Sequence, residues 1–392
     1  MREHFDLPKD IVYMNTGTMA FSPRSVNEVI SRYHYEFESN PTDGLMSAWG
    51  RLWEVQKDLA TFFKADPKDM ILRQNVTIAM AEFLGGIDLP KGSEIAVTDL
   101  EYGAIVNICR YRAERDGLSL STIKLPFKAK DVAKLSPDDY VDLIFSQLSP
   151  KTSLLMVSHV MTGTGMTLPI AKIGAECRRR GIVCVIDGAH GAGTAHLDFS
   201  NLPVDFYGSN LHKWMMGPKG TGFGWFNPEI KDRVKLNFAG WTTYGIPLYH
   251  QAFGEGDAFS QRWMMASTHD FAPYYAIREI LRFWRTQSPE KILATQKKLA
   301  SNLWQRVQSE LGWTCVSGAL HPELQGAKFA FELPDRFQKM GLDFISLMRT
   351  KYGLQIITPQ IKNEFHLRLS PHIYNTLEDI DFAVEALKKV SR

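Results

Sequence analysis

The sequence predicts an α/β fold in which a large domain, built on a mostly parallel sheet flanked by helices, is joined to a smaller α+β C-terminal domain. The chain has 392 residues, a length that favours two hydrophobic cores over one. Its middle alternates apolar runs of strand length with amphipathic stretches of helix length, the pattern of a parallel sheet covered on both faces. After about residue 266 long helical patterns dominate, so we expect a large domain over residues 15–260 and a small domain formed by residues 1–14 and 261–392.

The central strands and the helix between them have the clearest signals. Residues 153–159 form an apolar run of strand length. The segment after Pro169 has apolar residues at helical spacing and ends in three arginines before Gly181. Cations in the last turn followed by glycine are typical of a helix C-terminus. A second apolar run, residues 182–186, leads directly into Asp187. These segments predict two buried parallel strands joined by a helix.

The remaining elements follow from the same periodicities, taken in chain order. We expect two further strands of the large sheet at residues 206–207 and 221–226. In the small domain we expect helices at residues 274–285, 289–311 and 377–390 and strands at residues 327–333 and 364–369. Because no linker rich in glycine and serine separates the two domains, their boundary is placed only loosely, near residue 260.

The composition disfavours several classes of function. The formal net charge is +2, from 45 basic and 43 acidic side chains, so electrostatics favour neither nucleic acid nor a membrane surface as a partner. The N-terminal MREHFDLPKD lacks the apolar region of a secretory signal, and no apolar run is long enough to span a bilayer, so we expect a cytoplasmic location. The cysteines lack CxxC spacing and the histidines lack a His-Glu-x-x-His pattern, which predicts neither a disulfide framework nor a metal site.

Two segments carry residues suited to carbonyl chemistry. Lys213 follows a short strand and a polar turn, and the glycine-rich Gly-Pro-Lys-Gly-Thr-Gly comes next. A lysine amine shielded from water can lose its proton and attack a carbonyl, and small residues let backbone N–H groups approach a phosphate. Asp187 stands at the carboxyl end of a buried strand, where ligands bind in open α/β sheets. Taken singly, Lys213 is better explained as a surface lysine, and Asp187 could be a helix cap.

In combination these segments resemble the fold-type-I, pyridoxal 5'-phosphate (PLP)-dependent enzymes of the class V aminotransferase family. The resemblance extends over most of the chain and includes the strings at residues 13–17, 74–77, 101–103, 158–162 and 368–375. Within the family, Glu-Tyr-Gly-Ala, Asp-Gly-Ala-His and His-Ile-Tyr-Asn are most similar to the isopenicillin-N-epimerase-like subgroup. The resemblance implies the fold of the fold-type-I PLP-transferases and PLP as the cofactor.

The resemblance assigns roles to individual residues. Lys213 matches the lysine that holds PLP as a Schiff base and later moves the α-proton of the substrate. Asp187 matches the carboxylate beside the pyridine nitrogen, which makes the ring an electron sink. Arg368 matches the arginine that binds a substrate carboxylate through two parallel hydrogen bonds. The other matching positions are expected to contact the cofactor: Tyr102 by stacking, Thr162 and His190 by hydrogen bonds, and Val76, Thr77, Asn210 and His212 at the phosphate.

Thr268 matches a threonine that relatives donate to the phosphate of the neighbouring subunit. It stands in the polar stretch Ala-Ser-Thr-His-Asp, ahead of a helix and behind Trp263, Met264 and Met265. The resemblance therefore implies a homodimer with shared active sites. A simple helix N-cap explains Thr268 equally well.

Four functions are candidates for a protein with this fold. The leading hypothesis is chemistry at the α-carbon of an amino acid or an amino-acid-derived substrate, either epimerisation or transamination. The alternative is β-elimination by a PLP-dependent C–S lyase, and a non-catalytic binding protein on the same fold is a third reading. Desulfuration needs an exposed, electropositive cysteine, and Ile373 stands at the position where the relatives have it. The sequence leaves the side chain of the substrate open.

Overall fold

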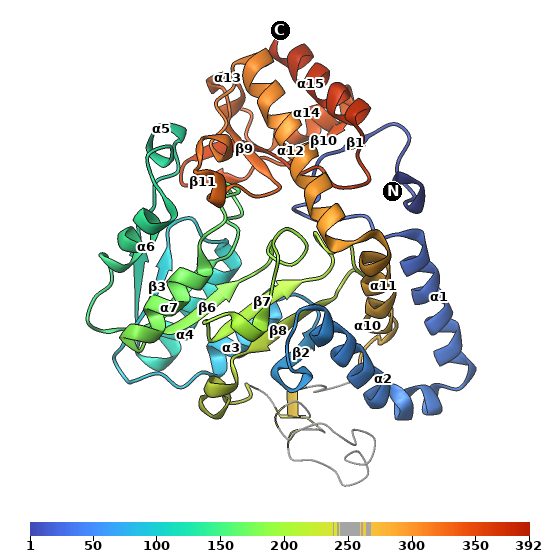
Figure 1. Ribbon diagram of the computed structural model, residues 1–392, viewed down its shortest axis with the longest axis vertical. Coiled ribbons are helices and arrows are strands. Elements are labelled where there is room, and N and C mark those ends of the chain that lie inside the picture. Colours follow the sequence, from blue (N-terminus) through green and yellow to red (C-terminus); the bar gives the residue numbers. More distant parts are fainter. Residues whose placement is uncertain (238, 241–242, 244–258, 260–261, 264–267) are drawn as a thin grey trace.

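The computed structural model describes the whole chain except residues 238, 241–242, 244–258, 260–261 and 264–267 (Figure 1). Its centre is a seven-stranded sheet in the order β2-β8-β7-β6-β5-β3-β4. The strands are β2 (Met70–Arg73), β3 (Glu94–Thr98), β4 (Ser119–Ile123), β5 (Thr152–Ser158), β6 (Val183–Asp187), β7 (Phe206–Asn210) and β8 (Gly222–Phe226). β8 runs antiparallel to the other six strands of this sheet, which are parallel to one another, so the predicted mostly parallel sheet is confirmed.

Helices cover both faces of the sheet. The helices of the described chain are α1 (Arg24–Ser39), α2 (Pro41–Phe62), α3 (Val76–Gly86), α4 (Gly103–Asp116), α5 (Ala129–Val132), α6 (Pro137–Phe145), α7 (Ile170–Arg180), α10 (Ala272–Tyr275), α11 (Ile277–Gln287), α12 (Pro289–Leu311), α13 (Asp335–Gln338), α14 (Asp343–Tyr352) and α15 (Leu377–Ser391). On β6, Cys184 and Ile186 face a core shared with α2, α6 and α7, whereas Val183 and Val185 face a core shared with α3 and α4. Burying one such aliphatic side chain contributes about 1.5–3 kcal/mol, so β6 is anchored on both sides immediately before Asp187.

Helix α7 has the termini that the sequence predicts. It begins directly after Pro169 and ends at Arg180. Gly181 follows with a φ of +68°, the left-handed conformation that closes a helix and that a side chain would strain. The helix thereby returns the chain to the sheet in the register that places β6 beside β5.

The C-terminal part of the chain forms a smaller α+β unit, which lies above the large sheet in Figure 1. β9 (Phe329–Glu332), β12 (Glu364–Leu369) and β11 (Gln360–Ile361) make an antiparallel sheet in the order β11-β12-β9. Side chains of α12, α14 and α15 share a core with this sheet. The N-terminal strand β1 (Val12–Tyr13) pairs in parallel with β10 (Leu354–Gln355), so the start of the chain packs with its end. The predicted smaller α+β unit is confirmed.

The exact limits of the two predicted domains stay a prediction. Helices α10 and α11, which follow residue 260 in the sequence, contact α1 and α2. Their side chains Tyr275, Ile280 and Trp284 belong to the same core as α2. This stretch therefore packs with the large sheet and its helices before α12 leads into the smaller unit.

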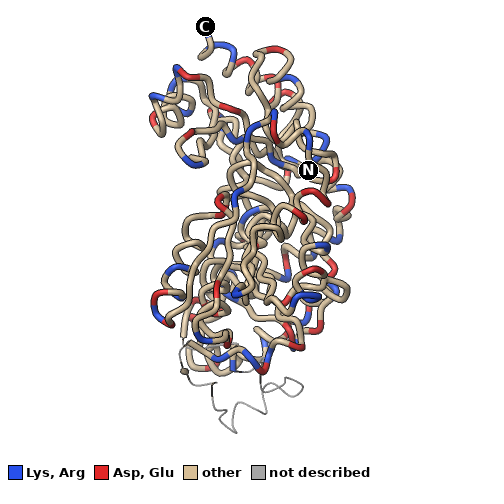
Figure 2. Tube along the Cα trace, turned by 90° about the vertical axis from the view of Figure 1, so that its left-hand side faces the viewer, with Lys and Arg blue, Asp and Glu red and all other residues tan. Residues whose placement is uncertain are grey.

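Charges are spread along the chain. Figure 2 shows lysine and arginine interspersed with aspartate and glutamate over the described trace. Within that trace, no helix combines the length and the apolar character needed to cross a membrane. The same residues contain no group of three or more His, Cys, Asp and Glu side chains arranged to hold a metal ion.

Candidate active site

Several of the predicted site residues meet at the carboxyl edge of the large sheet. Asp187 ends β6 and lies between Ser158 of β5 and Gly208 of β7. Asn210 ends β7 and pairs with Gly222, the first residue of β8. Because β8 is antiparallel to β2, the end of β2 and the start of α3 reach the same edge. Ligands of open α/β sheets bind at this edge.

The turn after β6 has room for glycine alone at three positions, of which Gly188 and Gly193 fix its packing. A Cβ on Gly188 would lie 2.1 Å from the Tyr207 ring, and a Cβ on Gly193 would lie 2.5 Å from the backbone of Trp214. Gly193 also has a φ of +86°, which a side chain rarely adopts. The two glycines let this turn pack against β7 and against the loop that contains Lys213.

Lys213 and Asp187 form the electrostatic centre of the site. Asp187 is 2% exposed. Burial raises the pKa of its carboxyl group, while a 2.8 Å hydrogen bond from the N–H of Ala189 and the charges of two lysines, Lys213 and Lys328, lower it. Burial lowers the pKa of the Lys213 amine to about 8, although Asp187 opposes the shift, and the charge of Arg368 lowers it further. A fraction of this amine is therefore unprotonated near neutral pH, the form that attacks a carbonyl.

His190 contributes a buried donor. Its Nδ1 accepts a 3.0 Å hydrogen bond from the indole N–H of Trp214, so the neutral ring carries its proton on Nε2. That Nε2 is buried and has no partner among the described residues. Burial lowers the pKa of the ring well below its ordinary value, and the charges of Lys213, Lys328 and Arg368 act in the same direction. A neutral N–H donor fits the hydrogen-bonding role predicted for His190.

The N-terminal segment holds Arg368 in place. The Nη2 of Arg368 donates to Asn15 Oδ1 at 3.3 Å and to Thr18 Oγ1 at 2.9 Å. Its Nη1 donates to the carbonyl of Thr162 at 3.2 Å. The Nε is buried and has no partner in the described part of the chain. Two-pronged binding of a carboxylate uses two N–H groups of the guanidinium, so a substrate carboxylate would take Nε and displace Asn15 or Thr18 from Nη2.

Tyr102 and Thr162 lie beside this arginine. Tyr102 stands at the start of α4 and is 49% exposed. Burial lowers the pKa of the Arg368 guanidinium to about 10, and the hydroxyls of Tyr13 and Tyr102 oppose that shift. An exposed ring at this place fits the predicted stacking role. Thr162 binds Arg368 through its backbone carbonyl, and the cofactor contact predicted for its side chain stays a prediction.

The predicted phosphate residues lie at the start of α3 and the end of β7. Asn210 Oδ1 accepts the N–H of Val76 at 2.9 Å. The Asn75 side chain caps α3 by accepting the N–H of Ile78 at 3.0 Å. The N–H and the hydroxyl of Thr77 have no hydrogen-bond partner among the described residues. At this helix start the N–H and hydroxyl of Thr77 are therefore available to bind an anion. The N–H of Val76 would first have to give up its hydrogen bond to Asn210.

The phosphate contacts of His212 and Thr268 stay predictions. The Nδ1–H of His212 donates to the carbonyl of Thr221 at 3.2 Å, and burial, together with the charges of Lys213 and Lys219, lowers the pKa of the ring to about 4. A phosphate beside the ring would raise its pKa again. Thr268 is exposed, and the neighbouring Met264, Met265 and Ser267 lie outside the described residues.

Sequence reasoning missed two charged residues of this site. Lys328 is 1% exposed, its charge acts on Asp187 and His190, and the charge of Lys213 acts on it. Glu101 accepts hydrogen bonds from the Thr98 hydroxyl at 2.8 Å and from the Ser158 N–H at 3.2 Å. Burial raises the pKa of the Glu101 carboxyl group to about 7. No local pattern identifies either, because Lys328 opens an apolar strand and Glu101 follows one.

The residues present fit PLP. Three buried atoms, His190 Nε2, Arg368 Nε and Lys328 Nζ, have no partner among the described residues. Their side chains influence one another's pKa values together with Lys213. Buried polar atoms in native proteins are hydrogen-bonded with few exceptions, so a polar ligand is expected here. PLP would present a carbonyl to Lys213, a ring nitrogen to Asp187 and oxygen acceptors to the donors.

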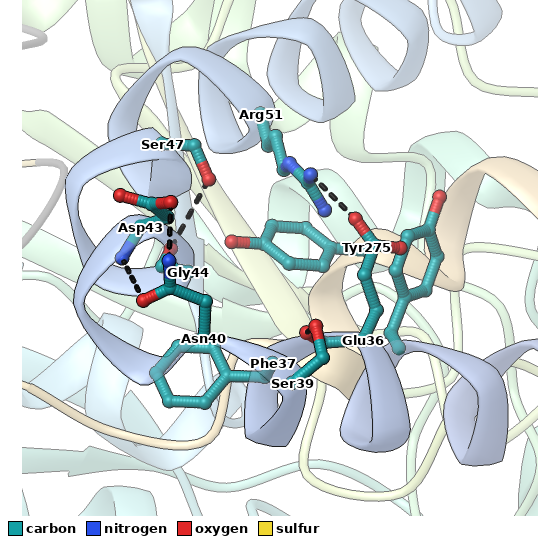
Figure 3. Close-up of a pocket in the computed structure, with 10 residues that line it drawn as sticks. Glu36, Phe37, Ser39, Asn40, Asp43, Gly44, Ser47, Arg51 and Tyr275 are labelled. Carbon is teal, nitrogen blue, oxygen red and sulfur yellow. Dashed lines mark hydrogen bonds and ion pairs between the residues drawn. The ribbon is translucent and has the colours of Figure 1, made fainter.

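A separate hollow of about 300 Å³ lies between α1, α2 and α10 (Figure 3). Its polar side chains bind one another. Arg51 donates to Glu36 at 2.6 Å and lies over the ring of Tyr275, and Asn40 accepts the backbone N–H of Asp43 at 3.3 Å. Because these groups satisfy one another, the hollow gives no argument for a ligand.

Comparison with known proteins agrees with this geometry. Residues 12–382 match the family model described as aminotransferase class-V. An isopenicillin N epimerase of Streptomyces clavuligerus is 30% identical over 97% of this chain and 95% of its own length. A probable cysteine desulfurase of Xylella fastidiosa is 23% identical over 98% and 92%, and a hercynylcysteine sulfoxide lyase of Schizosaccharomyces pombe is 22% identical over 97% and 94%.

Solved structures share the fold. A mutant of C-DES, with glycine covalently linked to its PLP cofactor, superimposes with a TM-score of 0.87 at 22% identity and covers 99% of this chain and 98% of its own. The cystine C–S lyase C-DES in complex with its product cysteine persulfide has a TM-score of 0.85 at 23% identity and covers 97% of both chains. This likeness confirms the predicted fold, that of the fold-type-I PLP-transferases.

Proposed function

Because this chain belongs to the class V aminotransferase family, we propose that it is a PLP-dependent enzyme that acts at the α-carbon of an amino acid or an amino-acid-derived substrate, by epimerisation or transamination. The observation that carries the proposal is the meeting of Lys213, Asp187 and Arg368, whose charges act on one another at one edge of the sheet. A reactive amine, a buried carboxylate and a carboxylate-binding arginine are the groups that this chemistry requires.

Each of these residues has a separate task. When bound, PLP supplies an electron-withdrawing ring that stabilises negative charge on the α-carbon. The Asp187 carboxylate would hold a proton on the ring nitrogen of bound PLP, and the Ala189 N–H keeps that carboxylate oriented. The Lys213 amine, whose pKa burial lowers to about 8, takes the α-proton or returns it. Arg368 fixes the substrate carboxylate, which determines the direction in which the α-hydrogen points.

The relatives favour epimerisation over elimination. The isopenicillin N epimerase of Streptomyces clavuligerus matches this chain at higher identity than the hercynylcysteine sulfoxide lyase does. A PLP-dependent C–S lyase is the second candidate, because that lyase and the C-DES structures align with nearly the whole chain. Desulfuration is disfavoured, because all four cysteines are buried and burial raises the pKa of Cys109 and Cys315 to about 12. Free, buried thiols also agree with the cytoplasmic location that we propose.

Incubation of the PLP-loaded protein with a panel of L- and D-amino acids in deuterium oxide separates these reactions. Deuterium at the α-carbon with inversion indicates epimerisation, a keto acid with loss of the amino group indicates transamination, and pyruvate with a released thiol indicates C–S lysis. We expect α-deuteration of both enantiomers of at least one amino acid, measured by NMR. Absence of all three products across the panel would favour a non-catalytic binding protein over an enzyme.

Arg368→Lys is expected to weaken substrate binding while leaving PLP binding nearly unchanged. Lysine keeps the charge but loses the planar set of donors that binds Asn15, Thr18 and a carboxylate at once. A hydrogen bond to a charged group contributes about 1.5–3 kcal/mol, so we expect the KM to rise by roughly 10- to 100-fold. Steady-state kinetics and titration with PLP measure the two effects. Equal losses of PLP and of substrate affinity would instead indicate a structural arginine.

The shared-site homodimer belongs to the same proposal. Its support is the exposed position of Thr268 in a single chain and the match of that residue to a threonine that relatives donate across the interface. Thr268→Ala is expected to bind PLP about 10- to 100-fold more weakly, as loss of one hydrogen bond to an anion predicts. Mixing this variant with Lys213→Ala should restore activity, because one site of the hybrid then carries both defects and the other carries neither. A monomer that keeps PLP and activity would contradict the shared site.

A further inference from the structure

We propose that Lys328 is a second proton-transfer group of the active site, serving the face of the substrate α-carbon opposite to the face that Lys213 serves. The inference rests on the proposed function and deepens it, since it assigns a residue to inversion at the α-carbon. It makes epimerisation, rather than transamination, the reaction for which the site is built.

Lys328 shares a face of the small sheet with Arg368. In the ladder between β9 and β12, Arg368 lies opposite Ala330 and Leu369 opposite Phe329. Side chains alternate between the two faces of a strand, and residues paired across antiparallel strands lie on the same face. Lys328 directly precedes β9 and stands two residues before Ala330, so the alternation of the strand, carried one residue beyond its start, places Lys328 on the same face as Arg368. The charges of Arg368, Lys213 and Asp187 all act on its amine.

The loop after β5 leaves space for this lysine. Gly165 has a φ of +75°, and a Cβ built on it would lie 2.6 Å from the carbonyl oxygen of Lys328 and 3.3 Å from its Cγ. Any side chain at this position would collide with Lys328. The same loop contributes the Thr162 carbonyl that accepts a hydrogen bond from Arg368 at 3.2 Å. Loop, lysine and arginine are thus parts of one packed unit.

The amine of Lys328 is buried among the charges of the site. Its Nζ has no hydrogen-bond partner among the described residues, although the side chain is 1% exposed. Burial lowers the pKa of this amine well below its ordinary value, the charges of Arg368 and Lys213 act in the same direction, and Asp187 opposes them. Lysines are almost never fully buried unless they are paired. A buried amine with a lowered pKa loses its proton more readily than an exposed one, and beside a reactive lysine its unprotonated form can accept a proton from a substrate.

Inversion at the α-carbon needs proton transfer on two faces, and two amines from different parts of the fold meet this need. Lys213 belongs to the loop after β7, and Lys328 directly precedes β9. In one direction the neutral Lys328 amine takes the α-proton, the electrons of the broken C–H bond stay with the substrate, and the Lys213 ammonium donates a proton to the other face. The two amines exchange roles in the reverse direction, so no oxidant or reductant is consumed.

The test compares Lys328→Met with Lys339→Met, in which an exposed lysine of the same C-terminal unit is replaced. Methionine fills the buried space without an unpaired amine, so the cofactor-free Lys328→Met protein should unfold at the same or a higher temperature. Borohydride should still fix PLP on Lys213 in both variants. These two measurements show that the fold and the cofactor site persist, independently of turnover.

Exchange of the α-proton then decides the role of Lys328. For the amino acid whose enantiomers the wild type deuterates fastest, Lys328→Met should lose exchange of one enantiomer by about 10²- to 10⁴-fold, the usual contribution of a general acid or base, and keep exchange of the other. Lys339→Met should exchange both as the wild type does. Equal losses for both enantiomers with a raised KM would indicate that Lys328 binds the substrate. Unchanged exchange would indicate that Lys328 has no role in proton transfer. Either result overturns the proposal.

A measurement on the wild type covers the case in which the variant does not fold. During early turnover of an α-deuterated amino acid in ordinary water, two separate amines place only solvent hydrogen on the inverted product. A single lysine that serves both faces would return part of the deuterium, which would refute the role of Lys328. A wild type that inverts no amino acid would overturn both this inference and the epimerisation on which it rests, whereas inversion with returned deuterium overturns the inference alone.

Discussion

Lys213→Ala is expected to bind PLP only through non-covalent contacts and to lose turnover by at least about 10²- to 10⁴-fold, the range for removal of a general acid or base. The residue supplies both the carbonyl-reactive amine and a proton-transfer group. Its amine is already poised for these tasks, because burial lowers its pKa to about 8. The wild type should be yellow, and borohydride should fix a pyridoxyl group on Lys213, as peptide mass spectrometry would show.

Lys219 offers a matched control for this experiment. It follows in the same glycine-rich stretch, and its Nζ donates to the hydroxyl of Ser22 at 2.9 Å. Lys219→Ala should retain the borohydride label on Lys213. A label found on any other lysine, or no label after incubation with PLP, would overturn the assignment of Lys213 and with it the proposed function.

Asp187→Asn is expected to reduce turnover by about 10²- to 10³-fold, the usual loss when one electrostatic stabiliser of a transition state is removed. The carboxylate is 2% exposed and accepts a hydrogen bond from the Ala189 N–H, which an asparagine oxygen can also accept. The fold should therefore persist while the negative charge beside the ring nitrogen is lost, and a neutral pyridine stabilises a carbanion poorly. Single-turnover kinetics with a deuterated substrate would localise the loss to removal of the α-proton.

Asp205 provides the comparison for this variant. Its half-buried carboxylate accepts the N–H of Cys184 at 2.7 Å, and burial raises its pKa as it does for Asp187. It lies just before β7, however, and so at the opposite edge of the sheet from the site. Asp205→Asn should change stability more than turnover. If Asp187→Asn worked at the wild-type rate, its role beside the cofactor would be wrong.

Much of the fold and the centre of the site were predictable because their signals are local. The apolar run before Asp187 predicted a buried strand, and β6 ends at that residue. Three arginines and Gly181 predicted the end of a helix, and α7 ends at Arg180. Lys213 stood out because it lies between a strand and a glycine-rich turn, and those neighbours are visible in a short stretch of sequence.

Residues whose environment depends on distant segments could not be assigned in this way. Arg368 was expected to bind a carboxylate, but only the folded chain shows that Asn15 and Thr18 occupy its Nη2. Val76 was expected at a phosphate, and the fold gives its N–H to Asn210. Each of these contacts joins residues more than a hundred positions apart, so no periodicity in the sequence reports it.

Lys328 shows most clearly what the local sequence does not predict. By sequence it is a lysine that opens an apolar strand, and such residues are commonly exposed at a strand end. The sequence by itself determined the order of strands and helices and the local setting of Lys213 and Asp187, because hydrophobic periodicity and turn residues act over a few neighbours. Only the tertiary structure decided that Lys328 is buried beside them, because burial and charge depend on the pairing of β9 with β12 and on the space that Gly165 leaves.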